Sequence, residues 1–192
     1  YTDSPVQSVQ RDANGVLITL KDQQSKRFDH VVLAAHADES LAMLVDPTES
    51  ERSALSSWSY QDNHVQLHTD SKVMPSDQRL WASWNYRRHS CSDDTTPVNI
   101  TYYMNRLQGL QTTQNYFVTL NSKQIVDPKK VIYSVDYTHP VYTSRSIDSQ
   151  KQLRSINGTH NTWSCGAYMR YGFHEDAVVS AHDVASHFGI TI

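Results

Sequence analysis

Glycine and long hydrophobic runs are both scarce in this sequence. Only 6 of the 192 residues are glycine, about 3% where ~7% is usual. No apolar run approaches the ~20 residues that a membrane-spanning helix needs, and the first residues lack the charged and then apolar order of a signal peptide. The sequence also begins without methionine, although 4 methionines occur within it. These features predict a piece cut or processed from a longer chain, without a transmembrane segment.

Positive charge and cysteine are also limited. The 17 Lys and Arg residues are outnumbered by 20 Asp and Glu residues, which gives a formal net charge of −3. Because the basic residues are dispersed and form no stripe, a nucleic-acid partner is not expected. Cys91 and Cys165 are too few for a disulfide framework or a four-cysteine metal site, which favours a reducing, cytoplasmic setting.

Histidine and serine are plentiful but are not arranged as a recognisable catalytic or metal site. The 10 histidines lack the spacing of zinc ligands, so no metal is expected. The G-x-S-x-G turn of serine hydrolases is missing. Two interpretations of Cys91 and His89 stay open. Cys91 could be a thiol nucleophile beside His89, or the two residues could be close in the sequence by chance.

The first 45 residues have the pattern of an α/β layer. Residues 6–20 predict a β-hairpin around Asn14-Gly15. The near-continuous apolar run at 29–35 is typical of a strand covered on both faces. Asp38 is then expected to cap a short helix that carries Leu41, Leu44 and Val45.

The middle of the chain changes character. Asp46-Pro47-Thr48-Glu49 is a strong helix start, and we expect that helix to run to about Trp58. Alternating aromatic and β-branched residues then predict a largely antiparallel sheet, and a helix closes this part of the chain. The strands are expected at residues 64–69, 80–87, 98–105, 116–120 and 131–137, and the helix at 147–156.

The last segment predicts a strand, a glycine corner and an amphipathic helix. The strand is expected at 163–168, the corner at Gly172, and the acidic Glu175 and Asp176 at the helix N-terminus. The apolar residues of the helix recur as one 3.6-residue stripe that should face a core. These residues are Ala177, Val178, Ala181, Val184, Ala185 and Phe188.

The two ends of the chain are therefore predicted to form one structural unit, into which the middle of the chain is inserted as another. The predicted fold class is mixed α+β and α/β: a largely antiparallel sheet with helices at 46–156, inserted between the strands of an incomplete α/β domain at 1–45 and 157–192.

Two constellations could carry function. The first is at residues 165–181, where a strand, a glycine and a helix N-terminus follow one another. This arrangement would bring backbone N–H groups and a positive dipole to a ligand. The alternative is a strand–helix corner that needs glycine for its backbone conformation alone. An aromatic group could line a flat apolar cavity, or could be ordinary sheet core. The aromatic residues are Trp81, Trp84, Tyr86, Tyr102 and Tyr103.

Residues 166–181 resemble the C-terminal flavin motif of FAD-dependent, amine-oxidase-like oxidoreductases. Residues 28–38, 81–86, 102–107 and 137–142 fit the same family in order, so the resemblance covers almost the whole chain. It implies an FAD-binding α/β domain interrupted by a substrate domain, and hydride removal from a carbon centre to FAD. The substrate would be a small molecule, apolar or an amine.

The resemblance also implies site residues. The flavin and ribityl would lie along 172–178, the backbone of Val6 would face the adenine, and Ala34-Ala35 would end a strand near the dinucleotide. The aromatic face would cover the flavin on its substrate side. The implied cofactor residues are Val6, Ala35, Gly166, Gly172, Phe173, His174, Glu175, Asp176, Ala177 and Val178. The implied substrate residues are Trp81, Trp84, Tyr86 and Tyr102.

Two features depart from that family. It usually has glycine where this chain has Ala177, and the G-x-G-x-x-G unit that grips the FAD pyrophosphate is missing. The expectation is therefore the C-terminal portion of a flavoenzyme, inactive and unable to retain FAD without a preceding FAD-binding segment. No catalytic acid or base can be named. The alternative is a non-catalytic module that binds an apolar ligand or a protein through its aromatic sheet face.

Overall fold

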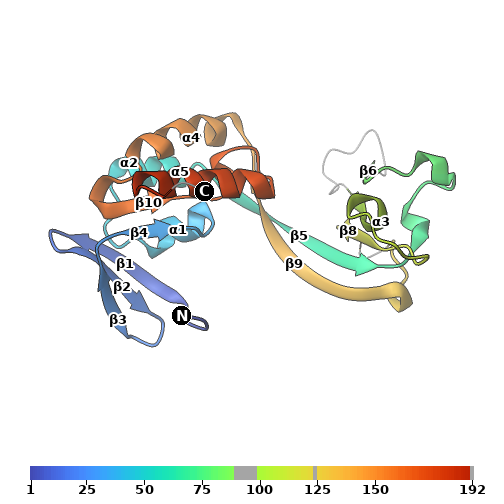
Figure 1. Ribbon diagram of the computed structural model, residues 1–192, viewed down its shortest axis with the longest axis horizontal. Coiled ribbons are helices and arrows are strands. Elements are labelled where there is room, and N and C mark those ends of the chain that lie inside the picture. Colours follow the sequence, from blue (N-terminus) through green and yellow to red (C-terminus); the bar gives the residue numbers. More distant parts are fainter. Residues whose placement is uncertain (89–98, 123–124, 191–192) are drawn as a thin grey trace. The chain divides into compact units, whose positions relative to one another are not determined.

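The computed structural model describes residues 1–88, 99–122 and 125–190, and it divides into two compact units (Figure 1). The first unit comprises Tyr1–Tyr60 and Pro140–Ile192, and the second comprises Gln61–His139. The first unit is thus built from both ends of the sequence. The helices at 49–55 and 144–156, which lie within the predicted inserted part, pack on each other in this first unit.

A three-stranded antiparallel sheet opens the first unit. Strands β1 (Val6–Asp12) and β2 (Gly15–Leu20) form the predicted hairpin. The Asp12 carboxylate accepts a hydrogen bond from the Asn14 N–H at the turn. A third strand, β3 (Ser25–Phe28), pairs with β2 and was not expected, because all four of its residues are exposed and show no apolar alternation.

A two-stranded parallel sheet joins the two ends of the sequence. Strand β4 (Val31–Leu33) pairs with β10 (Thr162–Ser164). Val31 and Leu33 are buried in the first core, but Val32 between them is 45% exposed. The expectation of a strand covered on both faces was therefore wrong: within the described residues only one face of β4 is packed.

The helices of the first unit begin where side chains cap them. Helix α1 begins after His36 rather than at Asp38, and α2 begins after Thr48, two residues later than predicted from Pro47. Thr48 and Glu51 form a reciprocal capping box, which satisfies amides at the helix start. The helices are α1 (Ala37–Met43), α2 (Glu49–Leu55), α4 (Ser144–Ile156) and α5 (His174–His187), with 3₁₀ turns η4 (Thr159–Asn161) and η5 (Ala167–Met169).

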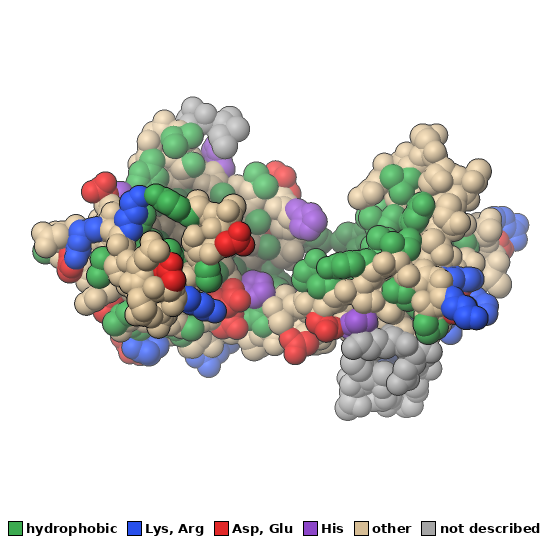
Figure 2. All heavy atoms as spheres, turned by 90° about the horizontal axis from the view of Figure 1, so that it is seen from below, with side chains coloured by type: hydrophobic (Ala, Val, Ile, Leu, Met, Phe, Trp, Pro, Cys, Tyr) green, Lys and Arg blue, Asp and Glu red, His purple; other side chains and the backbone are tan. Residues whose placement is uncertain are grey.

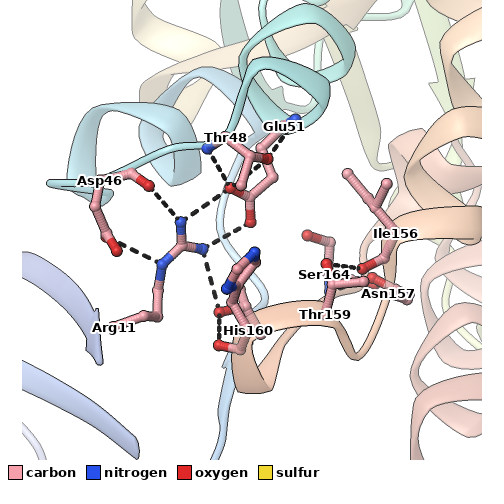
Figure 3. Close-up of polar contacts among 10 residues, drawn as sticks. Arg11, Asp46, Thr48, Glu51, Ile156, Asn157, Thr159, His160 and Ser164 are labelled. Atoms are coloured by element: carbon pink, nitrogen blue, oxygen red, sulfur yellow. Dashed lines mark hydrogen bonds and ion pairs between the residues drawn. The ribbon is translucent and has the colours of Figure 1, made fainter. Parts of the chain in front are cut away.

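A buried ion pair ties β1 to α2 and to β10 (Figure 3). The Arg11 guanidinium binds both carboxylate oxygens of Glu51, at 2.6 and 2.9 Å. It also contacts the side chain and carbonyl of Asp46 and the hydroxyl of Thr162. Burial opposes the charge on Glu51, but the Arg11 contacts outweigh it and lower the pKa of Glu51.

The buried face of α5 overlaps the predicted stripe only in part, at Val184. Asp176, Ser180 and Val184 are its buried residues, while Val178 is 58% exposed and Phe188 is 43% exposed. The two polar residues are buried because they are hydrogen-bonded: Ser180 Oγ accepts from the Gly166 N–H and Asp176 accepts from the Phe173 N–H.

The second unit is built on a five-stranded sheet of order β6-β7-β8-β5-β9, with each registered pair antiparallel as expected. The strands are β5 (Ser59–His68), β6 (Trp84–Arg87), β7 (Asn99–Tyr103), β8 (Phe117–Leu120) and β9 (Val131–Val141). Short helices connect them: η1 (Ser71–Val73), η2 (Gln78–Leu80), α3 (Met104–Leu107) and η3 (Pro128–Lys130). No helix among the described residues is long and apolar enough to cross a membrane.

One side of this sheet encloses a polar cluster beside the apolar core. His68 is fully buried and stacks on Phe117. Its Nδ1 accepts from the Asp70 N–H at 3.1 Å, so Nε2 carries the proton and donates to Thr119 Oγ1 at 2.8 Å. Thr119 is in turn bonded to Thr101 at 3.0 Å. Burial lowers the pKa of His68 to about 4, and the ring is neutral at pH 7.

Candidate functional site

The strand ends at β4 and β10 bring two predicted site residues together. Gly166 lies just beyond β10 and Ala35 just beyond β4, and the Cys165 N–H donates to the Leu33 carbonyl at 3.1 Å. Both residues therefore lie at the carboxyl ends of parallel strands, the edge at which α/β folds bind ligands. Gly166, η5, Gly172 and the start of α5 follow one another there, and we call residues 166–178 the glycine corner.

The two glycines of the corner are required by the chain's own packing. Gly166 has φ +152° and Gly172 has φ +93°. A β-carbon would lie 2.8 Å from the Tyr168 ring at the first position and 2.8 Å from the Tyr142 hydroxyl at the second. The backbone therefore needs glycine here whether or not a ligand is bound, and the glycines alone do not indicate one.

The N-terminus of α5 supplies hydrogen-bond donors to the corner. Phe173 is the N-cap residue, and its N–H is taken by the Asp176 carboxylate at 3.0 Å. Asp176 also pairs with Arg170 at 3.3 Å. By helix geometry the amides of His174 and Glu175 have no partner within the helix, and both residues are exposed. The corner thus offers two N–H groups at the positive end of the helix dipole.

The charges around these amides decide which part of a flavin cofactor fits. Glu175 is exposed, whereas the charge of Asp176 is balanced by Arg170, so the Glu175 carboxylate opposes a pyrophosphate at these amides. Uncharged acceptors, such as ribityl hydroxyls or ring carbonyls, fit two amides beside a carboxylate that can accept a hydrogen bond. Ala177 is half-buried and Val178 is exposed, so both are accessible at the surface.

Tyr142 belongs to the corner although sequence reasoning did not select it as a site residue. Its hydroxyl lies against Gly172 and donates to the Ala167 carbonyl at 3.3 Å. Burial, and then the charge of Asp176, raise the pKa of Tyr142 to about 12, which keeps the phenol neutral. The signal that could have found it was its place in the 137–142 stretch, but nothing in that stretch shows its contact with Gly172.

Val6 lies in a different sheet from the strands that lead to Ala35 and to the glycine corner. It pairs with Leu20 at the beginning of β1 and is half-buried against the first core. Its sheet, β1-β2-β3, is separate from the β10-β4 sheet that carries Ala35 and Gly166.

The aromatic residues of the second unit divide into two groups. Trp84 and Tyr86 line a hollow of about 540 Å³, and Tyr102 lies opposite Trp84 with ring centroids 5.5 Å apart. Trp81 is instead a buried core residue, packed on Phe117, and it borders a separate hollow of about 440 Å³. Trp81 is therefore ordinary core, as one of the two interpretations predicted, and the use of Trp84, Tyr86 and Tyr102 as a ligand surface stays a prediction. Figure 2 shows hydrophobic side chains exposed together on this unit.

The remaining candidate chemistry is limited. Cys165 is buried, and burial raises the pKa of its thiol, so it is a poor nucleophile. Cys91 and His89 lie outside the described residues. Within 1–88, 99–122 and 125–190, no group of three or more metal-ligating side chains comes together.

Comparison with solved structures supports the fold. A CLA-producing fatty acid isomerase from P. acnes aligns with a TM-score of 0.62 at 15% identity, over 97% of this chain and 48% of that one. Cyclohexylamine oxidase from Brevibacterium oxydans IH-35A aligns with a TM-score of 0.60 at 11% identity, over 98% and 49%. Reduced UDP-galactopyranose mutase gives 0.62 at 12% identity, over 98% and 47%. The chain spans about half the length of these proteins, and all three likenesses concern the fold.

Comparison at the level of sequence identifies the family. No curated protein sequence matches the chain. The family model described as flavin containing amine oxidoreductase matches residues 1–122, which is more than half of the chain. This agrees with the mixed fold, in which mostly antiparallel sheets are combined with few helices. The chain belongs to the flavin containing amine oxidoreductase family.

Proposed function

We propose that this chain forms part of a flavin-dependent oxidoreductase that removes a hydride from a carbon centre of a small substrate, either apolar or an amine. The observation that carries the proposal is the glycine corner, which presents two helix-terminal amides at the carboxyl ends of parallel strands in a chain of flavoprotein family. FAD, when bound, supplies the two-electron acceptor.

In this proposal the first unit holds one end of the cofactor. The amides of His174 and Glu175 donate to uncharged oxygens of the ring or ribityl, with residues 172–178 lying along it. The neutral Tyr142 hydroxyl holds the loop carbonyl of Ala167 in place. Ala35, Gly166 and Val6 are proposed to approach the dinucleotide through their backbone.

The grip on the pyrophosphate is proposed to come from elsewhere in a longer protein. This sequence has no G-x-G-x-x-G, and the exposed carboxylate of Glu175 opposes a phosphate at the corner. The sequence at 1–45 and 157–192, with the helices that pack on it, then forms part of a cofactor domain. The remainder, within 46–156, provides the substrate-binding region, including Trp84, Tyr86 and Tyr102.

The test is the spectrum of the natural gene product that contains this sequence. It should purify with visible flavin absorbance, or acquire that absorbance when FAD is added. Addition of a substrate under exclusion of oxygen should bleach it, because hydride transfer reduces the flavin. A colourless protein that binds no added FAD would refute the proposal.

A further inference from the structure

Two side chains of helix α4 hold the carbonyl groups of the glycine corner. The side-chain amide of Gln150 donates to the Tyr168 carbonyl at 3.0 Å and to the Arg170 carbonyl at 2.5 Å. The Arg154 guanidinium donates to the Met169 carbonyl between them, at 2.5 Å. Three consecutive carbonyls of the corner are therefore directed toward α4.

The backbone of the corner does not satisfy these carbonyls by itself. The Met169 N–H donates to the Gly166 carbonyl at 3.0 Å, and the N–H groups of Arg170 and Gly172 both donate to the Ala167 carbonyl. Within the described residues, the carbonyls of residues 168–170 accept from no backbone N–H group. A buried or half-buried carbonyl needs a partner, so the two α4 side chains decide which way this part of the turn faces.

The bond from Gln150 also sets the direction of a free backbone donor. The carbonyl that it holds belongs to the peptide joining Arg170 to Tyr171. That peptide is planar and trans, so its N–H points opposite to its carbonyl, away from α4. In the part of the chain that the structure describes, no group accepts from the Tyr171 N–H, and Tyr171 is 76% exposed. The Tyr171 amide is thus an available donor whose direction Gln150 fixes.

We propose that Gln150 is a positioning residue of the cofactor site. It fixes the Tyr171 N–H as a third donor of the glycine corner, in addition to the amides of His174 and Glu175. The inference rests on the proposed function, because the acceptor for this donor is an uncharged oxygen of FAD. A donor that is already fixed binds more tightly than a mobile one, since less conformational freedom is lost on binding.

The first part of the test is NMR of the flavin-free chain of 192 residues. Gln150→Met keeps the length of the side chain and removes both of its donors. The amide nitrogen signals of Met169 and Tyr171 should shift, because each shares a peptide group with a carbonyl that loses its partner. Hydrogen exchange of the Gly172 N–H should become faster as the turn loosens.

The matched control is Gln152→Met on the same helix. Gln152 donates to the Ser50 carbonyl at 3.2 Å, which lies outside the glycine corner. This variant should shift the amide signal of Glu51, which follows Ser50, and should leave the signals of Met169 and Tyr171 in place.

The second part is the affinity for FAD of the natural gene product that contains this sequence, titrated by flavin absorbance. Gln150→Met should bind FAD about 2–10-fold more weakly than the unaltered protein, the value of one hydrogen bond, whereas Gln152→Met should bind it equally well. Gln150→Glu is a second variant of the same shape. Its carboxylate oxygens face the two carbonyls and repel them, so it should weaken FAD at least as much.

Circular dichroism first shows that each variant is folded. Unmoved signals of Met169 and Tyr171 in Gln150→Met, or equal FAD affinities of Gln150→Met and Gln152→Met, overturn the inference. A purely structural role would lower stability in both variants without separating their affinities. A natural protein that binds no FAD with Gln150 in place refutes the proposed function instead, and the NMR comparison still decides whether Gln150 orients the turn.

Discussion

His68 makes the stability of the second unit depend on pH in a defined window. In the folded chain its pKa is about 4, because it is buried, against 6.5 for an exposed histidine. Between these values the unfolded chain binds a proton that the folded chain does not, so stability falls as pH falls from 6.5 to 4 and is fully present above 6.5. The difference of about 2.5 pKa units corresponds to about 3 kcal/mol.

The perturbation is His68→Gln, which cannot titrate but can still accept from the Asp70 N–H and donate to Thr119. Urea denaturation of both proteins across this pH range should show the unaltered chain losing up to about 3 kcal/mol more than the variant. His174→Gln, at an exposed histidine, is the matched control and should retain the full dependence. In parallel, NMR of the imidazole nitrogens should show His68 neutral, with the proton on Nε2, down to about pH 5.

The reasoning fails if His68 titrates near 6.5, or if the pH dependence of the His68→Gln variant matches that of the unaltered chain. Either result would mean that the ring is hydrated or that the bonds to Asp70 and Thr119 do not persist.

Two further predictions concern the first unit. Glu51→Gln should lower the free energy of unfolding by up to about 3–5 kcal/mol, because it removes the buried partner of Arg11 and leaves only the partly exposed Asp46 to balance the buried charge. Arg27→Gln, which breaks the exposed pair with Asp12, should cost less than about 1 kcal/mol in the same urea titration. Gly172→Ala should cost about 1–3 kcal/mol through its positive φ and the contact with Tyr142. Gly109→Ala, at φ +63° with open space around it, should cost less, and equal losses at the two glycines would show that the Tyr142 contact contributes nothing.

Local signals predicted the elements well and their burial less well. The hairpin, the antiparallel strands and α5 follow from turn residues and periodicity, which depend on neighbours in sequence. The buried face of α5 does not, because Ser180 and Asp176 are buried by hydrogen bonds to the Gly166 and Phe173 backbone that hydropathy cannot register. Strand β3 was not predicted, because its residues show no hydrophobic alternation and only backbone pairing with β2 makes it a strand.

The candidate site shows the same division. Ala35 and Gly166 could be selected from the sequence because strand ends and glycines leave local marks, and the structure places both just beyond the carboxyl ends of paired parallel strands. Tyr142 and His68 depend on partners distant in the sequence, Gly172 and Thr119 respectively. The separation of Trp81 from Trp84 depends on which residues the sheet buries, and alternation alone does not distinguish a core tryptophan from an exposed one.

The most direct test of the central claim is the affinity for FAD of two substitutions at one position, made in the natural gene product. His174 is the first residue of α5, where proline is favoured, and Phe173 before it is already extended. His174→Pro therefore removes one amide donor and keeps the helix, whereas His174→Ala removes only the side chain. Binding of FAD by the proline variant should be about 2–10-fold weaker than by the alanine variant, the value of one hydrogen bond. Equal affinities would contradict the assignment of the α5 N-terminus to the cofactor.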